Sequence, residues 1–153
     1  MNIRRLMCTL LASFTVLGCT ISSAGAAEVP DETIVWLEDM EWVDLPIVEY
    51  WDINPMPLTT DSIDKSISKY SIGYVTHSID LNANDMVTFN CSYSPLSASI
   101  DFGVIASNGR FYYINVKEGS INQTIRISQS GSYSVAIRNN SSQTVRVVGF
   151  VNY

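Results

Sequence analysis

The segment from Asp80 to Met86, DLNANDM, places oxygen-bearing side chains at alternating positions. The same spacing is found at the start of calcium-binding loops, where ligands at every second residue wrap around one ion. The pattern then breaks: the sixth position holds Asp85 where a glycine makes the turn, and the twelfth holds Cys91 where a bidentate glutamate binds. A plain turn is the favoured interpretation, because Asn and Asp are natural turn formers. The calcium alternative has four candidate ligands: Asp80, Asn82, Asn84 and Asp85.

The chain has one histidine, His77, and one cysteine beyond residue 26, Cys91. One histidine does not build a zinc site without thiolates or grouped carboxylates. Cys91 lies between Phe89 and Tyr93, among the alternate residues that are expected to point inward. This position favours a role as a small buried apolar residue over a role as a nucleophile. The sequence contains neither a Gly-x-Ser-x-Gly motif nor a phosphate-binding glycine loop. We therefore predict a protein that is not an enzyme, with a small secreted hydrolase as the least favoured alternative.

Three consecutive aromatic residues occupy positions 111–113, and the middle one is Tyr112. On a strand, neighbouring side chains point to opposite faces, so one face of this triplet looks away from the core. An exposed ring there could stack on a sugar, as in a carbohydrate-binding sandwich. The favoured interpretation is that Tyr112 packs against a cross-strand neighbour. If the domain binds a glycan, we predict Tyr112 and Tyr74 as its ligand-binding residues.

Beyond Lys65 the apolar residues alternate with polar ones, which predicts half-buried antiparallel strands. Turn signals separate the strands, and Asn108-Gly109 is the sharpest of them because both residues tolerate the positive φ of a tight hairpin. With a first strand near Tyr70 to Ile79, about seven short strands are expected, which is typical of a β-sandwich. The predicted inward residues are Val87, Phe89, Cys91, Tyr93, Ala98, Ile100, Phe102, Val104, Ile121, Ile125, Ile127, Tyr133, Val135, Ile137, Val145, Val147 and Val151.

Residues 1–26 have the three-part layout of a secretory signal peptide. An Arg-Arg pair at 4–5 precedes an apolar run at 6–17, and Ala-Gly-Ala at 24–26 offers a cleavage site. The apolar run is shorter than the ~20 residues that cross a bilayer, so we predict no transmembrane span. We expect a secreted, extracellular protein. The sequence VLGC, ending at Cys19, resembles a lipoprotein box, so a lipid anchor at the cell surface is the alternative.

Residues 27–66 differ in charge from the rest of the chain. From residue 28 they contain eleven acidic residues and one lysine, whereas residues 67–153 contain four acidic and six basic residues. All three tryptophans also lie in this acidic segment. A charge asymmetry of this kind marks a tail or an interaction segment. We predict a signal peptide at 1–26, an acidic Trp-containing segment and linker at 27–66, and one β-sandwich domain at 67–153.

The acidic segment has two interpretations. Trp36, Met40 and Val43 recur at helical spacing, but Pro46 interrupts the pattern, so a short helix and an extended segment both stay open. It could be a recognition or pro-segment whose aromatic side chains dock on a partner. It could instead pack its apolar side chains on its own sandwich and keep its carboxylates in water, which we favour slightly. Nucleic acid is disfavoured, and we expect none as a partner, because the negative segment repels phosphate.

The stretches LNANDMVTF, ASIDFGVIASNGRFYY and GSYSVAIRNNSSQTVRVVGFV resemble small secreted β-sandwich proteins of Gram-positive, gut-type bacteria. More distantly, they resemble the prepeptidase C-terminal (PPC-like) domains that accompany secreted hydrolases. Gly131, Tyr133, Val135 and Ile137 match the Gly-x-Tyr-x-Val-x-Ile strand of those domains. The resemblance covers about residues 67–153 and implies an all-β, jelly-roll or PPC-like antiparallel sandwich with an accessory, non-catalytic role.

Taken together, these patterns predict an exported, non-enzymatic binding or accessory module whose ligand the sequence does not identify. An extracellular protein and a glycan both stay open as partners. A carbohydrate-binding module that uses exposed tyrosines is the first alternative function. No cofactor is expected, apart from calcium at the weak Asp80–Asp85 site.

Overall fold

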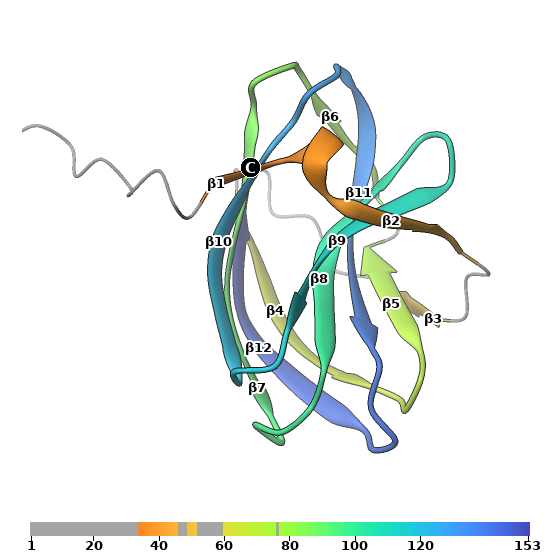
Figure 1. The fold of residues 1–153 in the computed structure, drawn as a ribbon, viewed down its shortest axis with the longest axis vertical. Helices are drawn as coiled ribbons and strands as arrows, with labels where there is room; N and C mark the ends of the chain where they lie inside the picture. Colours follow the sequence, from red (N-terminus) through yellow and green to blue (C-terminus); the bar gives the residue numbers. More distant parts are fainter. Residues whose placement is uncertain (1–33, 46–48, 52–59, 76) are drawn as a thin grey trace, which may run out of the picture.

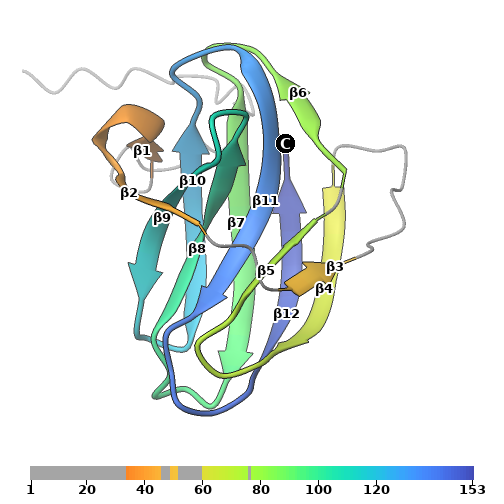
Figure 2. The ribbon, with the colours of Figure 1, turned by 90° about the vertical axis from the view of Figure 1, so that its right-hand side faces the viewer.

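The structure is a computed structural model that describes residues 34–45, 49–51, 60–75 and 77–153. The predicted signal peptide and Cys19 lie outside the described residues. In the described part, two sheets pack face to face as a sandwich (Figures 1 and 2). No described helix is long and apolar enough to cross a membrane.

The first sheet has five strands in the described part of the chain, in the spatial order β1-β10-β7-β12-β4. The second has seven, in the order β2-β9-β8-β11-β5-β3, with β6 also paired to β11. We call them the five-stranded and the seven-stranded sheet. Their strands are β1 (Ile34–Trp36), β2 (Glu41–Asp44), β3 (Glu49–Trp51), β4 (Thr60–Ile67), β5 (Ile72–Val75), β6 (Ile79–Leu81), β7 (Met86–Ser94), β8 (Ile100–Ala106), β9 (Arg110–Val116), β10 (Ser120–Arg126), β11 (Gly131–Asn139) and β12 (Val145–Asn152).

The strand pairs are nested, as in a long hairpin rolled upon itself. β8 pairs with β9, β7 with β10, β5 and β6 with β11, and β4 with β12, and all of these pairs are antiparallel. This nesting distributes the strands over two sheets and is the jelly-roll arrangement. The predicted fold class, an all-β sandwich of jelly-roll type, is confirmed. The structure adds two parallel pairs at sheet edges, β1 with β10 and β3 with β5.

The core lies between the sheets and consists of the side chains that the alternation assigned to it. All seventeen predicted inward residues are buried. Phe89 of the five-stranded sheet contacts Phe102 of the seven-stranded sheet edge to face, with ring centroids 5.9 Å apart. Such pairs add about 1 kcal/mol to the burial of apolar area. The Asn108-Gly109 hairpin is also confirmed, since β8 ends at Ala106 and β9 begins at Arg110, with φ of 81° at Gly109.

The strand number differs from the sequence prediction in two places. The single strand expected near Tyr70 to Ile79 is two strands, β5 and β6, and Tyr70 itself lies in a turn at φ 53°. The acidic segment also contributes strands: β4 pairs with β12 along eight residues, from Thr60 to Ile67. The five-stranded sheet therefore includes residues on the N-terminal side of position 67. Several strands of the acidic segment are only three or four residues long, so their sequences show no clear alternation of apolar and polar residues.

The described part of the acidic segment is extended and packs on the sandwich. Residues 34–44, which we call the strap, run as β1 along β10, turn through a 3-10 helix at Leu37–Asp39, and continue as β2 along β9 (Figure 2). Because β10 and β9 belong to different sheets, the strap bridges the two sheets on one side. Leu37 and Met40 are buried in the core between them. The strap therefore covers parts of two sheet edges that would otherwise expose backbone groups.

Candidate functional site

The structure separates the two predicted ligand-binding tyrosines. Tyr112 is half-buried and packs against the core between the sheets, while Phe111 and Tyr113 lie on the outer face of the seven-stranded sheet. The packed position of Tyr112 agrees with the favoured interpretation, in which this side chain packs on its own sheet rather than standing exposed. Tyr74 belongs to the outer-face cluster instead and lies beside Ala136 of β11. A ligand role for Tyr112 and Tyr74 stays a prediction, and they do not share one surface.

The outer face of the seven-stranded sheet carries a buried ion pair. Arg138 donates to Asp101 from both Nη2, at 2.6 Å, and Nε, at 2.7 Å, and the Asp101 side chain is 1% exposed. Asn115 and Asn140 also donate to this carboxylate. The Arg138 guanidinium lies 4.6 Å from the ring centroid of Tyr113, a cation–π distance. Both carboxylate oxygens of Asp101 accept bonds within the protein, which favours a structural role over a reactive one.

The strap is tied to this cluster through Tyr113. Its hydroxyl donates a 2.8 Å hydrogen bond to Glu41 of β2, and this bond, together with burial, raises the pKa of Tyr113 above its ordinary value. Two other basic residues stack on strap tryptophans: Arg110 lies 3.9 Å from the Trp42 ring centroid, and Arg126 lies 5.0 Å from that of Trp36. The strap tryptophans are thus engaged with their own domain, which is the interpretation that the sequence slightly favoured.

The calcium-like segment forms a turn between β6 and β7. The Asp85 carboxylate accepts a 2.7 Å hydrogen bond from the backbone N–H of Asn82. Asn84 takes a φ of 76°, which Asn tolerates at the third position of a tight turn. Asp80 is exposed on β6. These contacts explain why Asn and Asp occupy the segment, and calcium binding by Asp80, Asn82, Asn84 and Asp85 stays a prediction.

The thiol lies on a strand of the five-stranded sheet, whereas the imidazole lies in the connection between two strands of the other sheet. Cys91 is buried on β7, its Sγ donates to the carbonyl of Phe150 at 3.6 Å, and burial raises its pKa to about 11. The thiol is therefore protonated and uncharged at neutral pH, and it packs as a small apolar side chain. His77 lies between β5 and β6, outside both strands. Among the described residues, no group of three or more His, Cys, Asp or Glu side chains could hold a metal ion.

The outer face of the five-stranded sheet carries few charged side chains. The pairing register sets its outward side chains in rows that run across β10, β7, β12 and β4. The first row is Thr124, Thr88, Asn152 and Thr60; the second is Asn122, Asn90, Phe150 and Ser62; and the third is Ser120, Ser92, Val148 and Asp64. We call these three rows the amide-hydroxyl face.

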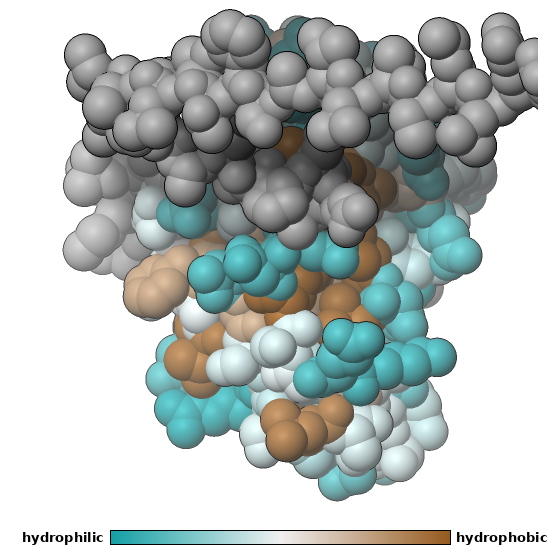
Figure 3. Space-filling model, turned by 60° about the vertical axis from the view of Figure 1, so that its left-hand side comes forward, coloured by the Kyte–Doolittle hydropathy of each residue, from teal (hydrophilic) through white to brown (hydrophobic). Residues whose placement is uncertain are grey.

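Two apolar side chains stand in the middle of the amide-hydroxyl face: Phe150 is 55% exposed and Val148 is 43% exposed. Figure 3 brings forward the side of the molecule on which this sheet lies and shows apolar residues among hydrophilic ones. The one acid of the rows, Asp64, is neutralised by Arg146, which donates from Nε and Nη2 at 2.8 Å each. This pairing lowers the pKa of Asp64.

A hollow of about 380 Å³ lies in this face. Amides of Asn90 and Asn122, hydroxyls of Ser92 and Ser120, and the apolar side chain of Phe150 line it, together with Val148. Gly149 is required at its floor, because a Cβ atom there would come within 2.2 Å of the Asn90 carbonyl oxygen. The sequence held a signal for this site: inward Val147 and Val151 imply that Val148 and Phe150 point outward.

No protein-family model matches the chain, and a search of curated proteins finds no match. Among solved structures, the chain is similar to that of Aeromonas hydrophila PliG, a periplasmic lysozyme inhibitor of g-type lysozyme. The TM-score is 0.46 at 12% sequence identity, and the similarity covers 69% of this chain and 96% of that one. The resemblance to PPC-like domains stays a prediction.

Proposed function

We propose that the protein is an exported, non-catalytic binding module and that the amide-hydroxyl face binds a neutral glycan. The observation that carries the proposal is the composition of the hollow around Phe150: amides, hydroxyls and one exposed ring, with no unpaired charge in its lining. Sugars present hydroxyl groups that pair with amides and an apolar C–H face that packs on a ring. A nearly uncharged surface provides no electrostatic attraction for an acidic or basic partner.

Two further observations support a binding role rather than catalysis. The Asp101 carboxylate is occupied by protein donors, and the Cys91 thiol is buried with a raised pKa. Glycoside hydrolysis needs two carboxyl groups facing each other across the bond to be broken. In the amide-hydroxyl face, the one carboxyl group, Asp64, is held in an ion pair with Arg146.

Co-sedimentation with insoluble neutral polysaccharides, such as cellulose and xylan, tests the proposal, with an acidic polysaccharide as the comparison. We expect binding to at least one neutral polysaccharide, and we expect Phe150→Ala to weaken it about tenfold, which corresponds to a ring contact of about 1.4 kcal/mol. Leu96→Ala is the matched control, because Leu96 is 70% exposed in the turn after β7, outside the three rows. Equal loss in both variants, or binding to the acidic polysaccharide alone, would refute the glycan site.

A protein partner is the second candidate. The exposed Val148 and Phe150 could equally form the centre of a small protein interface with a polar rim. A further variant, Asn122→Ala, separates the two candidates: a glycan-binding face loses its polysaccharide affinity in Asn122→Ala as well as in Phe150→Ala. A protein interface that depends on apolar contact is expected to lose affinity chiefly in Phe150→Ala.

A further inference from the structure

The three rows of the amide-hydroxyl face differ in whether their polar groups are already hydrogen-bonded. In the first row, the hydroxyl oxygens of Thr88 and Thr124 lie 2.9 Å apart, at hydrogen-bond distance. The Thr60 hydroxyl donates to the Asn152 side chain at 2.6 Å. Thr124 is buried, and Thr60 and Thr88 are half-buried. The hydroxyls of the first row are therefore engaged within the protein.

The second and third rows hold the polar groups that the protein itself leaves unbonded. All side chains of these two rows are exposed. Within the described chain, the side chains of Asn90, Asn122, Ser92 and Ser120 form no hydrogen bond. Amides and hydroxyls can each donate and accept. A ligand that lies along these two rows can therefore bond groups that otherwise face water.

The hollow in this face is longer across the strands than along them. Its lining comes from three adjacent strands, β10, β7 and β12, but its outward residues belong only to the second and third rows. Neighbouring strands lie about 4.8 Å apart, so the lining extends about 10 Å across the strands. Outward residues two positions apart on one strand are separated by only about 7 Å. A chain-like ligand therefore fits best when it crosses the strands.

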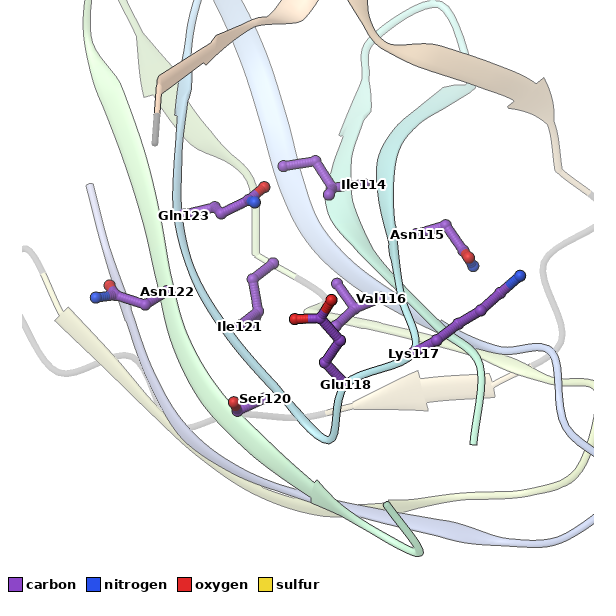
Figure 4. A pocket seen from close by; sticks show the side chains of 9 residues that line it. All are labelled: Ile114, Asn115, Val116, Lys117, Glu118, Ser120, Ile121, Asn122 and Gln123. Atoms are coloured by element: carbon purple, nitrogen blue, oxygen red, sulfur yellow. The ribbon is translucent and has the colours of Figure 1, made fainter. Parts of the chain in front are cut away.

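Both ends of these two rows reach an edge of the sheet. β1 pairs with β10 only at residues 124–126, so no described strand lies beyond β10 at Asn122. Figure 4 shows Asn122 pointing away from the pocket between β9 and β10, on the opposite side of the strand from Ile121. At the other end, the rows continue to Ser62 and Asp64 on β4, the last strand of the sheet. A long chain can therefore cross the face and extend past both edges.

The spacing of the strands matches one class of neutral glycan. In an extended β-1,4-linked chain, successive sugar units follow a nearly straight line, and the length of each unit is close to the distance between neighbouring strands. Each strand can then contact one unit through its outward residues. An α-1,4-linked chain coils instead, so its successive units turn away from a sheet surface.

We propose that the amide-hydroxyl face binds an extended β-1,4-linked neutral glycan that runs across the strands, with one sugar unit over each of β12, β7 and β10. Phe150 packs on the apolar face of the first unit, and Asn90 and Asn122 bond hydroxyls of the next two. This inference rests on the proposed glycan-binding function and adds the linkage, the direction of the chain and the order of its contacts. Because both ends are open, the site accepts internal segments of a long chain.

The test is calorimetric titration with cello- and xylo-oligosaccharides of increasing length, with malto-oligosaccharides as the coiled comparison. We expect the affinity for at least one β-1,4-linked series to rise about fivefold from the disaccharide to the trisaccharide, as one added hydrogen-bonding contact predicts. The rise should end at the tetrasaccharide, because the sheet has one further strand, β4, beyond β12. We expect malto-oligosaccharides of equal length to bind at least tenfold more weakly.

Two variants locate the ends of the bound chain. Asn122→Ala should weaken the trisaccharide about fivefold and leave the disaccharide unchanged, because a disaccharide over β12 and β7 does not reach β10. Phe150→Ala should weaken every length. Thr88→Val is the matched control: it lies on β7 in the first row, where its hydroxyl is already bonded to Thr124, and should keep the full dependence on length. The wild-type series is a test even if a variant fails to fold.

The results that would overturn this inference differ from those that would refute glycan binding itself. Equal affinity for all lengths, equal affinity for the malto-oligosaccharides, or an equal loss at every length in Asn122→Ala would each reject a chain that crosses the strands. Each of these results would leave a neutral glycan as the ligand. No binding to any neutral glycan would refute the proposed function and this inference together.

Discussion

The two outer faces of the sandwich differ in whether their apolar side chains are covered. On the seven-stranded sheet, Asp101, Arg138 and Tyr113 bind one another and the strap, and Phe111 beneath Arg138 is fully buried. On the five-stranded sheet, hydroxyl and amide side chains surround Phe150 and Val148, which stay exposed. The Asp101–Arg138 pair and the strap thus cover the apolar side chains of one face, whereas Phe150 and Val148 of the other face stay exposed, as the proposed binding role requires.

The largest expected effect is on the buried ion pair. Asp101→Ala leaves Arg138 largely desolvated without its partner and removes the acceptor of Asn115 and Asn140. Breaking one partner of a buried pair costs about 4 kcal/mol. Denaturant unfolding followed by tryptophan fluorescence measures this loss of free energy. A loss below about 1 kcal/mol would mean that this ion pair contributes no more to stability than a solvent-exposed pair does.

The next largest loss of stability is expected from a substitution of Gly149 on the five-stranded sheet. Gly149→Ala introduces a Cβ atom that would meet the carbonyl oxygen of Asn90, so β12 and β7 must separate locally. Overpacking of this kind costs about 2 kcal/mol. Thermal unfolding checks it, with Val148→Ala as the control, since that outward side chain is half exposed. Equal melting temperatures for the two variants would contradict the close approach of the strands.

The bond between the strap and the seven-stranded sheet has a smaller, pH-dependent effect. Tyr113→Phe removes the hydroxyl bonded to Glu41 and is expected to cost about 1 kcal/mol at neutral pH. The folded state raises the pKa of Tyr113, so its contribution is fully present below the unfolded pKa of about 10 and is lost as pH rises through the folded value. The wild type should therefore lose more stability above pH ~10 than Tyr113→Phe does. Parallel alkaline losses would contradict this assignment.

The smallest effect is expected at the exposed ion pair. Asp64 and Arg146 are both open to solvent, so Asp64→Ala should leave the stability at neutral pH unchanged within error. The lowered pKa of Asp64 means that its contribution is present above the unfolded pKa near 3.8 and is lost as pH falls through the folded value. Chemical denaturation at pH 7 in low and high salt tests this. A loss as large as that of Asp101→Ala would erase the contrast between the faces.

Much of the fold could be predicted from the sequence, because the alternation of apolar and polar residues indicates which side chains are buried. Every predicted inward residue is buried, since a strand covered on one face must alternate. The strands of the strap were not predicted, because three or four residues do not establish a period. Leu37 and Met40 fill the core from this irregular segment, and only the tertiary structure brings them there.

The sites were less predictable for two physical reasons. Three consecutive aromatic residues show no alternation of apolar and polar side chains that would tell which face points inward. The sequence therefore left two interpretations of Tyr112, packed or exposed, and the structure places its side chain against the core. The pairing of Asp101 with Arg138 was not predicted, because the two residues lie 37 positions apart in the sequence. The exposed pair Val148 and Phe150 was implied by alternation, but the amides beside it come from β7 and β10, whose pairing the sequence did not specify.

The most direct test of the glycan-binding face is a titration of the labelled protein with a soluble neutral oligosaccharide, such as a cello- or xylo-oligosaccharide, followed by amide chemical shifts. We predict shifts that cluster at Asn90, Asn122, Val148 and Phe150, with no cleavage of the sugar. Shifts confined to the seven-stranded sheet, or the appearance of shortened oligosaccharides, would contradict a non-catalytic site on the five-stranded sheet.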